Sequence, residues 1–357
     1  FDSPLYKKSR QVTSREAPAK LLAVPKTIKT PRLIASEPAS LQWCQQAIRD
    51  FLYTRVQRSP VGAFVDFTRQ DINGSVALEA SHSGLHCTID LSSASDRVSC
   101  WFVERLFRRS PDLLRALRST RSLYIQQDIS GRFPRYHYLR KFSTMGNATT
   151  FPVQSLAFLA IALGSLLWVR SKPLSRRYLR SLGEREVRVF GDDIIVPKDC
   201  ADATVEALQA FGLVVNSAKT FLTGRFRESC GVDAFAGEDV TGVCVLSAPE
   251  RAKPGAIVSL VDTHNNLCTR GYYCAADYIQ KTVRQAGYDR IRSVEHGSGS
   301  FGWYPNYLSP RIRLKTRVLK DRFVRQVYCY YPKVKQSRVP PTTSAGLLQF
   351  FTEAAEK

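Results

Sequence analysis

Two adjacent carboxylates, Asp192 and Asp193, are the residues of this sequence best placed to do chemistry. They lie in a stretch whose two arms are rich in β-branched residues, Val187-Arg188-Val189-Phe190-Gly191-Asp192-Asp193-Ile194-Ile195-Val196-Pro197. The pattern predicts a strand, a tight turn that begins at Gly191, and a second strand that ends at Pro197. Two carboxylates side by side repel each other, and a divalent cation is the simplest way to neutralise them. For an isolated Gly-Asp-Asp, a solvated turn is the more common interpretation.

A second acidic motif precedes this hairpin, Thr88-Ile89-Asp90-Leu91-Ser92-Ser93-Ala94-Ser95-Asp96. Asp90 follows an apolar strand, so we expect its side chain at a sheet edge. Carboxylates from two neighbouring strands can bind two divalent ions about 3.5–4 Å apart, and magnesium needs few protein ligands when phosphates supply the others. Such a pair can ionise an attacking hydroxyl and stabilise a leaving pyrophosphate. The small residues leave room for a sugar, which Ser95 and Asp96 could hydrogen-bond. The competing interpretation is that Ser92 to Asp96 only cap the following helix.

The elements that must position these residues are predicted from hydrophobic spacing. Helical spacing is found over 41–56, 96–107 and 201–211, strand patterns over 85–90 and 213–215, and loops with short strands over 1–38. Residues 105–141 are predicted to be a basic, largely irregular insertion. The apolar segment 151–169 nearly reaches transmembrane length, but its Pro152, Gln154 and Ser155 favour a helix buried in protein. The order of elements predicts an α+β fold, in which helices back an antiparallel sheet that displays the carboxylates.

Length and charge narrow the class of protein. With 357 residues, of which 44% are hydrophobic, we expect a globular chain of two or three subdomains. A formal net charge of +21 favours a polyanionic partner, nucleic acid first and an anionic membrane surface second. The nine cysteines form no C-x-x-C pair, so neither a zinc site nor a disulfide framework is indicated, and a reducing cytosol fits best. The chain opens on Phe1 rather than Met, which leads us to expect a fragment or an incomplete reading frame.

The region after residue 245 differs in composition. Residues 311–338 carry ten basic side chains against Asp321 alone, interleaved with Phe323, Tyr328, Tyr330 and Tyr331. A solvated helix face is one interpretation, and a nucleic-acid-binding face is at least as well supported.

Five short motifs follow one another in a defined order. They are Val24-Pro-Lys26-Thr-Ile-Lys29-Thr-Pro-Arg32, Asp90-Leu-Ser-Ser-Ala-Ser-Asp96, Met145-Gly-Asn-Ala-Thr-Thr-Phe151, Phe190-Gly-Asp-Asp193 and Phe226-Arg-Glu-Ser-Cys-Gly231. This series resembles the motifs of RNA-directed RNA polymerases, and more narrowly those of the replicase subunit of small positive-strand RNA bacteriophages (leviviruses). The resemblance extends from Val24 to about Val240. Gly-Asp-Asp alone is weak evidence, whereas five motifs in order are strong evidence.

The resemblance implies roles for individual residues. It implies catalytic metal ligands at Asp90, Asp192 and Asp193, and a proton donor for pyrophosphate at Lys219. It implies contacts with the incoming nucleotide at Lys26, Lys29, Arg32, Ser95, Asp96, Gly146 and Asn147, the first three with its triphosphate. Arg227, Glu228 and Ser229 match a hairpin next to the product strand.

The resemblance also implies a right-hand architecture with fingers, a palm built on an RNA-recognition-like antiparallel sheet, and a thumb. The expected boundaries are partial fingers with the basic motif at 1–81, palm at 82–104, a fingers/palm insertion at 105–140, palm with the Gly-Asp-Asp hairpin at 141–244, and thumb with a basic C-terminal region at 245–357. Because family members carry a longer stretch before the basic motif, we expect part of the N-terminal fingers to be missing.

The function implied is RNA-directed RNA polymerisation from ribonucleoside triphosphates, with two Mg²⁺ ions or Mn²⁺ in their place. Expected partners are template and product RNA, and by resemblance host elongation factors Tu and Ts and a ribosomal protein, in the cytoplasm of an infected bacterium and without a membrane. A reverse transcriptase is one alternative, but the small polar residues after Asp90 favour ribonucleotides. A non-catalytic RNA-binding fragment is the other, and it would have no use for three carboxylates where phosphates approach.

Overall fold

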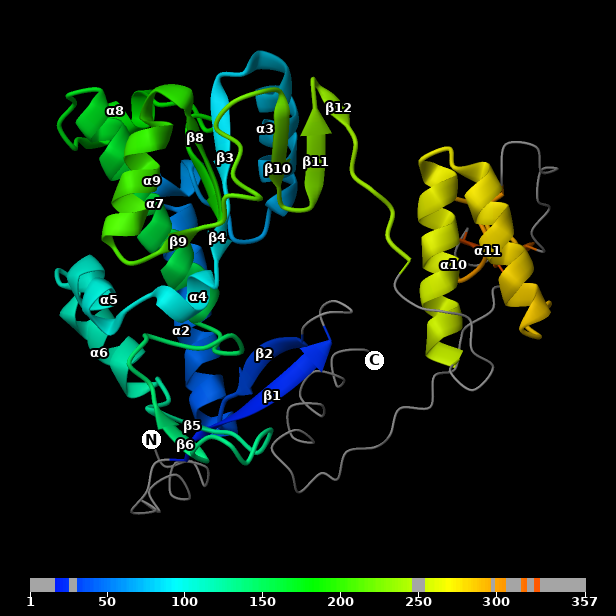
Figure 1. Cartoon of the computed structure of the whole chain (residues 1–357), viewed down its shortest axis with the longest axis horizontal. Coiled ribbons are helices and arrows are strands. Elements are labelled where there is room, and N and C mark those ends of the chain that lie inside the picture. Colours follow the sequence, from blue (N-terminus) through cyan, green and yellow to red (C-terminus); the bar gives the residue numbers. More distant parts are fainter. Residues whose placement is uncertain are drawn as a thin grey trace. The chain divides into compact units, whose positions relative to one another are not determined.

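The computed structural model describes residues 17–25, 31–245, 254–296, 299–305, 316–319 and 324–327. These residues belong to two units, the first ending at Thr241 and the second beginning at Gly242 (Figure 1). The first unit holds every acidic residue predicted to act in chemistry.

The helices of the first unit are α2 (Ala39–Gln57), α3 (Gln70–Ser83), α4 (Ala94–Arg97), α5 (Cys100–Phe107), α6 (Pro111–Ser119), α7 (Thr150–Val169), α8 (Arg176–Ser181) and α9 (Ala201–Ala210). Its strands are β1 (Ala19–Pro25), β2 (Pro31–Ser36), β3 (His86–Ile89), β4 (Leu91–Ser92), β5 (Tyr124–Gln126), β6 (Tyr136–Tyr138), β7 (Arg188–Phe190), β8 (Asp193–Pro197), β9 (Val214–Val215), β10 (Phe226–Ser229), β11 (Val232–Phe235) and β12 (Glu238–Asp239). The mixture of helices and antiparallel strands confirms the predicted α+β class.

An antiparallel sheet in the order β3-β8-β7 lies at the centre of the first unit (Figure 1). Its middle strand β8 is apolar along almost its whole length, as expected for a strand covered on both faces. Ile194 and Val196 pack into the main core, which α7 also lines, while Ile195 packs with Val76 and Ala77 of α3. Two helices therefore cover the sheet from opposite sides, and only its ends are left to display polar residues.

The long apolar helix α7 is a core helix, as the sequence predicted. It is long and apolar enough to cross a membrane, yet 72% of its most apolar window is buried inside the protein. Its hydrophobic residues surround the whole helix, which is the pattern of a helix enclosed by other elements. It packs against β7 and β8, and α9 lies beside it.

The first unit contains three further sheets among its described residues. Strands β10, β11 and β12 form an antiparallel sheet that packs on α3, and β4 pairs with β9. A four-stranded sheet in the order β2-β1-β5-β6 combines antiparallel pairs with a parallel pair between β1 and β5.

Two sequence-based expectations were wrong. The predicted helix over 96–107 is two helices, because Val98 is extended and Ser99 caps α5 by accepting the N–H of Phe102 at 3.1 Å. The spacing of hydrophobic residues alone does not reveal such a break between two helices.

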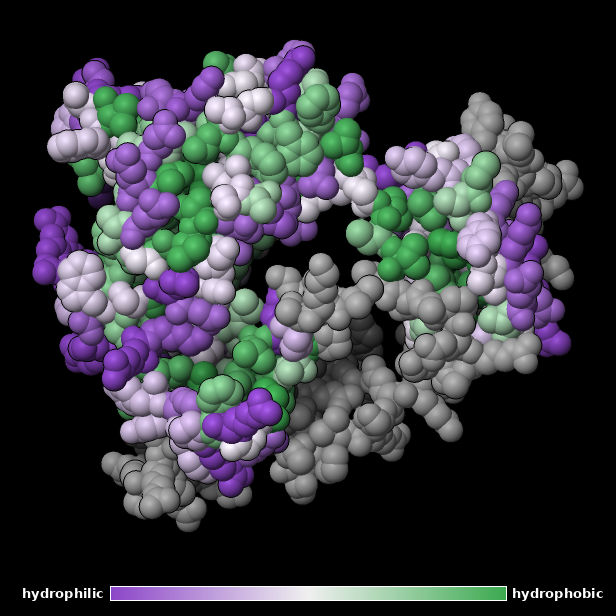
Figure 2. Space-filling view, viewed as in Figure 1, coloured by the Kyte–Doolittle hydropathy of each residue, from purple (hydrophilic) through white to green (hydrophobic). Residues whose placement is uncertain are grey.

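The region 105–141 is also more regular than predicted, since it holds α6, β5 and β6. The Arg121 guanidinium orders the end of this region by donating to the carbonyl oxygens of Leu139, Lys141 and Phe142 at 2.6–2.9 Å. The surface around α6 is largely hydrophilic, in keeping with the basic composition of the region 105–141 (Figure 2).

The second unit contains α10 (Pro254–Thr269) and α11 (Tyr273–Gln285), which pack on each other around Trp303. A hairpin of β13 (Thr316–Leu319) and β14 (Val324–Val327) follows. Most of the basic, aromatic stretch 311–338 lies outside the described residues.

Candidate active site

The acidic pair lies at the tip of the predicted hairpin. Phe190 of β7 pairs with Asp193 of β8, which leaves Gly191 and Asp192 as a two-residue turn. Gly191 has a φ of +64°, a conformation that suits the first position of such a turn. A Cβ at Gly191 would lie 3.0 Å from the Phe151 ring, so both the φ angle and the available space favour glycine here.

Helix α7 holds the tip in place. The N–H of Gly191 donates to Ser155 Oγ at 3.0 Å, and the rings of Phe190 and Phe151 meet edge to face with centroids 4.9 Å apart. The motif that ends at Phe151 and the motif that begins at Phe190 are therefore joined through the first turns of α7.

Asp90 is brought to the same end of the sheet by strand pairing. Ile89 of β3 pairs with Ile194 of β8, so Asp90 follows β3 where Asp193 begins β8. Asn216 Nδ2 donates to Asp90 Oδ2 at 2.7 Å, and the N–H of Asn216 donates to the Asp90 carbonyl at 2.9 Å. The N–H of Asp90 donates to Thr220 Oγ1 at 3.2 Å. Both the backbone and the side chain of Asp90 are thus fixed by the loop after β9.

The β10–β11 hairpin contacts Asp193. Its turn consists of Cys230 and Gly231, both with positive φ (+53° and +79°), between the paired residues Ser229 and Val232. The Cys230 thiol donates to Asp193 Oδ2, with 3.6 Å between sulfur and oxygen. This distance is consistent with the weak donor character of a thiol.

The three carboxylates form one electrostatic group. Burial raises the pKa of Asp193 to about 6, opposed by the backbone N–H of Cys230 and reinforced by the charges of Asp192 and Asp90. Burial also raises the pKa of Asp90, which the hydrogen bond from Asn216 lowers and the charge of Asp192 raises further. Ionising all three groups is costly unless positive charge is brought to them.

These residues fit a hard divalent cation that takes most of its ligands from elsewhere. Among the described residues, no three acidic, histidine or cysteine side chains are arranged to enclose an ion by themselves. The donors available are carboxylate oxygens, which magnesium prefers, and magnesium keeps waters or takes phosphate oxygens for its remaining positions. Asp90, Asp192 and Asp193 are therefore suited to an ion that arrives with a phosphate ligand.

Lys219 lies beside this group. Its Nζ donates to Glu228 Oε1 at 2.5 Å, a contact that raises the lysine pKa, and the charges of Asp90 and Asp193 raise it further. Lys219 is thus a protonated ammonium at the edge of the acidic group, where it could supply a proton.

Ser95 and Asp96 lie on the short helix α4 that follows β4. Ser95 is only 5% exposed, and its buried Oγ has no hydrogen-bond partner among the described residues. Asp96 is exposed and forms an ion pair with Lys141. A buried hydroxyl without a partner is uncommon, and Ser95 Oγ is one of nine buried side-chain atoms of this kind among the described residues.

Gly146 and Asn147 have structural roles in the turn before α7. Gly146 has a φ of +113°, and a Cβ there would lie 2.1 Å from the Ala35 carbonyl oxygen. Asn147 Oδ1 accepts the N–H and the hydroxyl of Thr149 at 2.8 and 2.7 Å. Within the described residues, no hydrogen bond or ion pair joins Ser95, Asp96, Gly146 or Asn147 to the three carboxylates.

The basic motif is only partly described. Lys26 and Lys29 lie outside the described residues, whereas Arg32 is exposed on β2. The same strand supports the turn before α7, since the N–H of Ala35 donates to the Met145 carbonyl at 2.7 Å. Two motifs far apart in sequence are therefore in contact.

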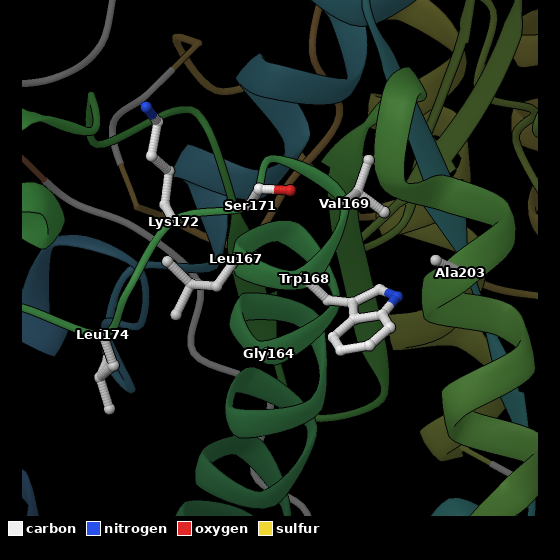
Figure 3. Close-up of a pocket in the computed structure, with 8 residues that line it drawn as sticks. All are labelled: Gly164, Leu167, Trp168, Val169, Ser171, Lys172, Leu174 and Ala203. Carbon is white, nitrogen blue, oxygen red and sulfur yellow. The ribbon is translucent and has the colours of Figure 1, made fainter.

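A separate cavity of about 770 Å³ lies at the C-terminal end of α7 (Figure 3). Leu167, Trp168 and Leu174 line it, together with Ala203 of α9. None of the predicted site residues lines this cavity, so it is separate from the acidic group.

Several residues that shape the site were not singled out from the sequence as site residues. Asn216 and Cys230 hold the carboxylates, and buried Gln45 accepts the N–H of Ala148 at 3.2 Å and donates to the Thr120 carbonyl at 2.7 Å. Buried Glu37 accepts the Ser122 hydroxyl at 2.5 Å. Cys230 stands within a recognised motif and Asn216 lies three residues before Lys219, which is a usable signal, whereas nothing in the sequence marks Gln45 or Glu37.

Comparison with known proteins adds a family. The family described as RNA replicase, beta-chain, matches residues 4–253. The RNA-directed RNA polymerase beta chain of Enterobacteria phage fr is 36% identical over 220 residues, 62% of this chain and 36% of the relative. The corresponding subunit of Qbeta virus (strain MX1) is 36% identical over 223 residues, 62% of this chain and 34% of the relative. The chain of Escherichia phage MS2 is 35% identical over 220 residues, 62% of this chain and 36% of the relative. The match thus spans about a third of the length of each relative.

Solved structures show weaker likeness. The chain of a structure titled "RdRp complex" aligns with a TM-score of 0.47 and 11% identity, covering 75% of this chain and 25% of that one. An RNA-dependent RNA polymerase of BmCPV at the elongation state aligns with a TM-score of 0.47 and 12% identity, covering 79% and 28%. Telomerase from Candida albicans aligns at 0.44 and 11%, covering 76% and 53%. At these scores the likenesses identify neither fold family nor function.

Proposed function

Because the chain belongs to the RNA replicase beta-chain family, we propose that it carries the catalytic centre of an RNA-directed RNA polymerase that replicates a single-stranded RNA phage genome. The observation that carries this proposal is the convergence of Asp90, Asp192 and Asp193 at one end of the central sheet, with protonated Lys219 beside them. The phage proteins that this chain matches over about a third of their length are named RNA-directed RNA polymerases, which supports the same activity here.

The reaction is nucleotidyl transfer. The 3′-hydroxyl of the growing RNA attacks the α-phosphate of a ribonucleoside triphosphate, a new phosphodiester bond forms, and the bond to pyrophosphate breaks. Two magnesium ions, or manganese in their place, held by Asp90, Asp192 and Asp193 would supply the positive charge that stabilises the attacking and leaving oxygens. The protein orients these carboxylates through Asn216, Cys230 and the Gly191 turn, so that little reorganisation is needed during the reaction.

Lys219 is the proposed source of a proton for the leaving pyrophosphate. Its pairing with Glu228 keeps the ammonium charged and close to the acidic group. A triphosphate that reaches the carboxylates can compete with Glu228 for this ammonium, because both are anionic. Lys219 Nζ then holds the proton that the leaving oxygen takes up.

The incoming nucleotide is proposed to contact two groups of residues. Lys26, Lys29 and Arg32 bind its triphosphate, and Ser95, Asp96, Gly146 and Asn147 surround its ribose. The buried Ser95 hydroxyl, which has no hydrogen-bond partner among the described residues, is available to a ribose hydroxyl. Asp96 is held by Lys141, so a ribose hydroxyl would join or replace that ion pair.

The same proposal covers the architecture and the setting. The central sheet belongs to a palm over 82–104 and 141–244, with partial fingers at 1–81, an insertion at 105–140 and a thumb with the basic C-terminal region at 245–357. Template and product RNA are the proposed partners. The family resemblance adds further proposed partners, namely the host elongation factors Tu and Ts and a ribosomal protein. It also suggests that the chain acts in the cytoplasm of the infected bacterium.

RNA-templated incorporation of labelled ribonucleotides tests the proposal. Asp192→Asn should lower incorporation by about 10²–10³-fold while RNA binding persists, because charge stabilisation at the reacting phosphate is lost. Asp202→Asn is the matched control, since Asp202 is an exposed aspartate on α9 outside the site. The reaction is run with and without a bacterial extract, which supplies host proteins.

Equal incorporation by the two variants would overturn the catalytic role of Asp192. RNA binding without incorporation in any mixture would favour a non-catalytic RNA-binding chain. Incorporation of deoxyribonucleotides in preference to ribonucleotides would favour a reverse transcriptase.

A further inference from the structure

The four-stranded sheet of the first unit has one face turned to the core and one to solvent. Ala19 of β1 pairs with Ile125 of β5, and both are buried. Their neighbours in the strands alternate to the other face, where Lys20 pairs with Gln126. The register of β5 with β6 therefore places Tyr124, Tyr136 and Tyr138 together on the solvent face.

These three tyrosines are exposed and adjacent. Their exposed fractions are 43% for Tyr124, 54% for Tyr136 and 58% for Tyr138. The rings of Tyr124 and Tyr138 meet edge to face with centroids 5.4 Å apart, and the Arg135 guanidinium lies 5.8 Å from the centre of the Tyr136 ring. Three large aromatic rings on the outer face of a short hairpin contribute little to the core, so their position needs another explanation.

The loop between β5 and β6 is organised by one buried side chain. Gln127 Nε2 donates to the carbonyl oxygens of Ser130, Phe133 and Pro134 at 2.8–3.1 Å. Gln127 Oε1 accepts the N–H groups of Ile129 and Ser130 at 3.1 and 3.0 Å. This ordered loop nevertheless leaves Phe133 66% exposed. A loop held in shape while it presents an aromatic ring to solvent is typical of a binding surface.

The charge of this sheet is strongly positive. Over 17–25, 31–36 and 121–141 there are seven basic residues and one acid, Asp128, which is paired with Arg135. Two of the other basic residues are also bound within the protein, because Lys141 pairs with Asp96 and Arg121 donates to backbone carbonyls. Lys20 and Arg32 are exposed, and the register of β1 with β2 places both on the same face as the tyrosines. A surface of this composition is complementary to a polyanion and not to a basic or purely apolar partner.

We propose that this outer face, defined by Lys20, Tyr124, Tyr136 and Tyr138, binds single-stranded RNA outside the catalytic carboxylates. Bases stack on the tyrosine rings, and a backbone phosphate pairs with Lys20. Single strands are favoured over duplexes because only unpaired bases expose their faces for stacking. This inference rests on the proposed function in one respect: the polymerase activity is the reason for taking the nucleic acid to be RNA.

The test measures equilibrium binding of the full chain to a short labelled single-stranded RNA and to its duplex. Tyr136→Ala and Tyr138→Ala should each weaken single-strand binding by about tenfold, while Tyr136→Phe and Tyr138→Phe keep it because the stacking ring remains. Trp168→Ala is the control, because Trp168 is an even more accessible aromatic, 83% exposed, at the end of α7. It should bind as the unmodified chain does.

A second measurement needs no variant. Photo-crosslinking of the unmodified chain to thiouridine-containing single-stranded RNA should place crosslinks within residues 124–138. Unchanged binding by both alanine variants, or crosslinks confined to other segments, would overturn the proposal. The proposal would also be overturned if the unmodified chain sedimented as a dimer and the alanine variants as monomers while RNA binding stayed intact. The face would then join two copies of the chain.

The outcomes also separate this proposal from the proposed polymerase activity. Loss of single-strand binding in the tyrosine variants supports the binding face even if the unmodified chain incorporates no nucleotide. Incorporation that requires Asp192, together with unchanged binding by the tyrosine variants, would leave the polymerase and remove the binding face.

Discussion

Cys230 donates its thiol hydrogen to the carboxylate of Asp193, with 3.6 Å between Sγ and Oδ2. Cys230 adopts a positive φ of +53°, a conformation in which Asn, Asp or Gly is usual for this kind of two-residue turn. A cysteine there is sterically unfavourable, and the contact with Asp193 offers a reason for its presence. The β10–β11 hairpin is thus tied directly to the acidic group.

Removing this thiol should weaken the site without unfolding it. Because Asp193 is a proposed metal ligand, Cys230→Ala is expected to raise the magnesium concentration needed for half-maximal incorporation by about tenfold, the size of effect typical of residues that orient metal ligands. Cys230→Ser keeps a hydrogen-bond donor, so its half-maximal magnesium concentration should lie between those of Cys230→Ala and the unmodified chain. A magnesium titration of the incorporation rate measures the effect, with exposed Cys44→Ala as the control. Identical titrations for Cys230→Ala and the unmodified chain would show that the contact is incidental.

The raised pKa of Asp193 predicts a pH-dependent stability. Its folded pKa of about 6 lies above the usual value of 3.8, so the folded state holds this proton more tightly than the unfolded chain. In metal-free buffer, the stabilisation is fully present below about pH 4 and is lost as the pH rises through about 6. Asp193→Asn should therefore unfold less readily than the unmodified chain at pH 7, by on the order of 2–3 kcal/mol. Urea unfolding at about pH 4 and at pH 7, in buffer that contains a chelator, measures the free energy of unfolding of both proteins. The prediction would be contradicted if this free energy changed with pH in Asp193→Asn as it does in the unmodified chain.

Asn216 should matter more for catalysis than for stability. Asn216→Ala removes the amide that donates to Asp90 at 2.7 Å, which leaves this carboxylate free to rotate. Because Asp90 is a proposed metal ligand, we expect incorporation to fall about 10–100-fold, the size of effect typical of residues that orient metal ligands. Ser217→Ala, at the exposed position next in the chain, is the control. The incorporation assay at saturating magnesium decides, and activity equal to the control would remove Asn216 from the site.

Gly146 should tolerate no side chain. Gly146→Ala would place a Cβ 2.1 Å from the Ala35 carbonyl oxygen at a φ of +113°, so the turn before α7 must move away from β2. The expected cost is about 2 kcal/mol or more, together with loss of incorporation. Gly131→Ala is the matched control, because a Cβ there meets open space. Thermal unfolding of both variants provides the comparison, and equal transition temperatures would be inconsistent with this packing.

Arg227 is a structural residue in spite of its place in a recognised motif. It is 1% exposed, and its guanidinium donates to the carbonyl oxygens of His86, Thr223, Gly224 and Phe226 at 2.6–3.4 Å. Arg227→Met should destabilise the first unit by about 3 kcal/mol, because buried carbonyls lose their donor. Exposed Arg225→Met is the control and should change stability by less than about 0.5 kcal/mol. Denaturant unfolding monitored by circular dichroism measures both variants.

Local pattern was sufficient for the elements that carry the chemistry. β-Branched arms around Gly191 predicted β7, β8 and their turn, because strand propensity and turn preference act over a few neighbouring residues. The apolar composition of 151–169 predicted a buried helix for the same reason. The order of the motifs was enough to indicate the family, which the match over residues 4–253 bears out.

Contacts between distant segments were decided by the tertiary structure alone. Asn216 meets Asp90 across 126 positions, and Arg227 meets His86 across 141, through pairings that no periodicity in either segment encodes. The outward face of Tyr124, Tyr136 and Tyr138 likewise depends on the register of β5 with β1 and β6. By itself, the sequence determined which residue types were available and which short elements they form. The packing of those elements decided which side chains meet, because a hydrogen bond or a shared electrostatic field depends on distances in space and not on distance along the chain.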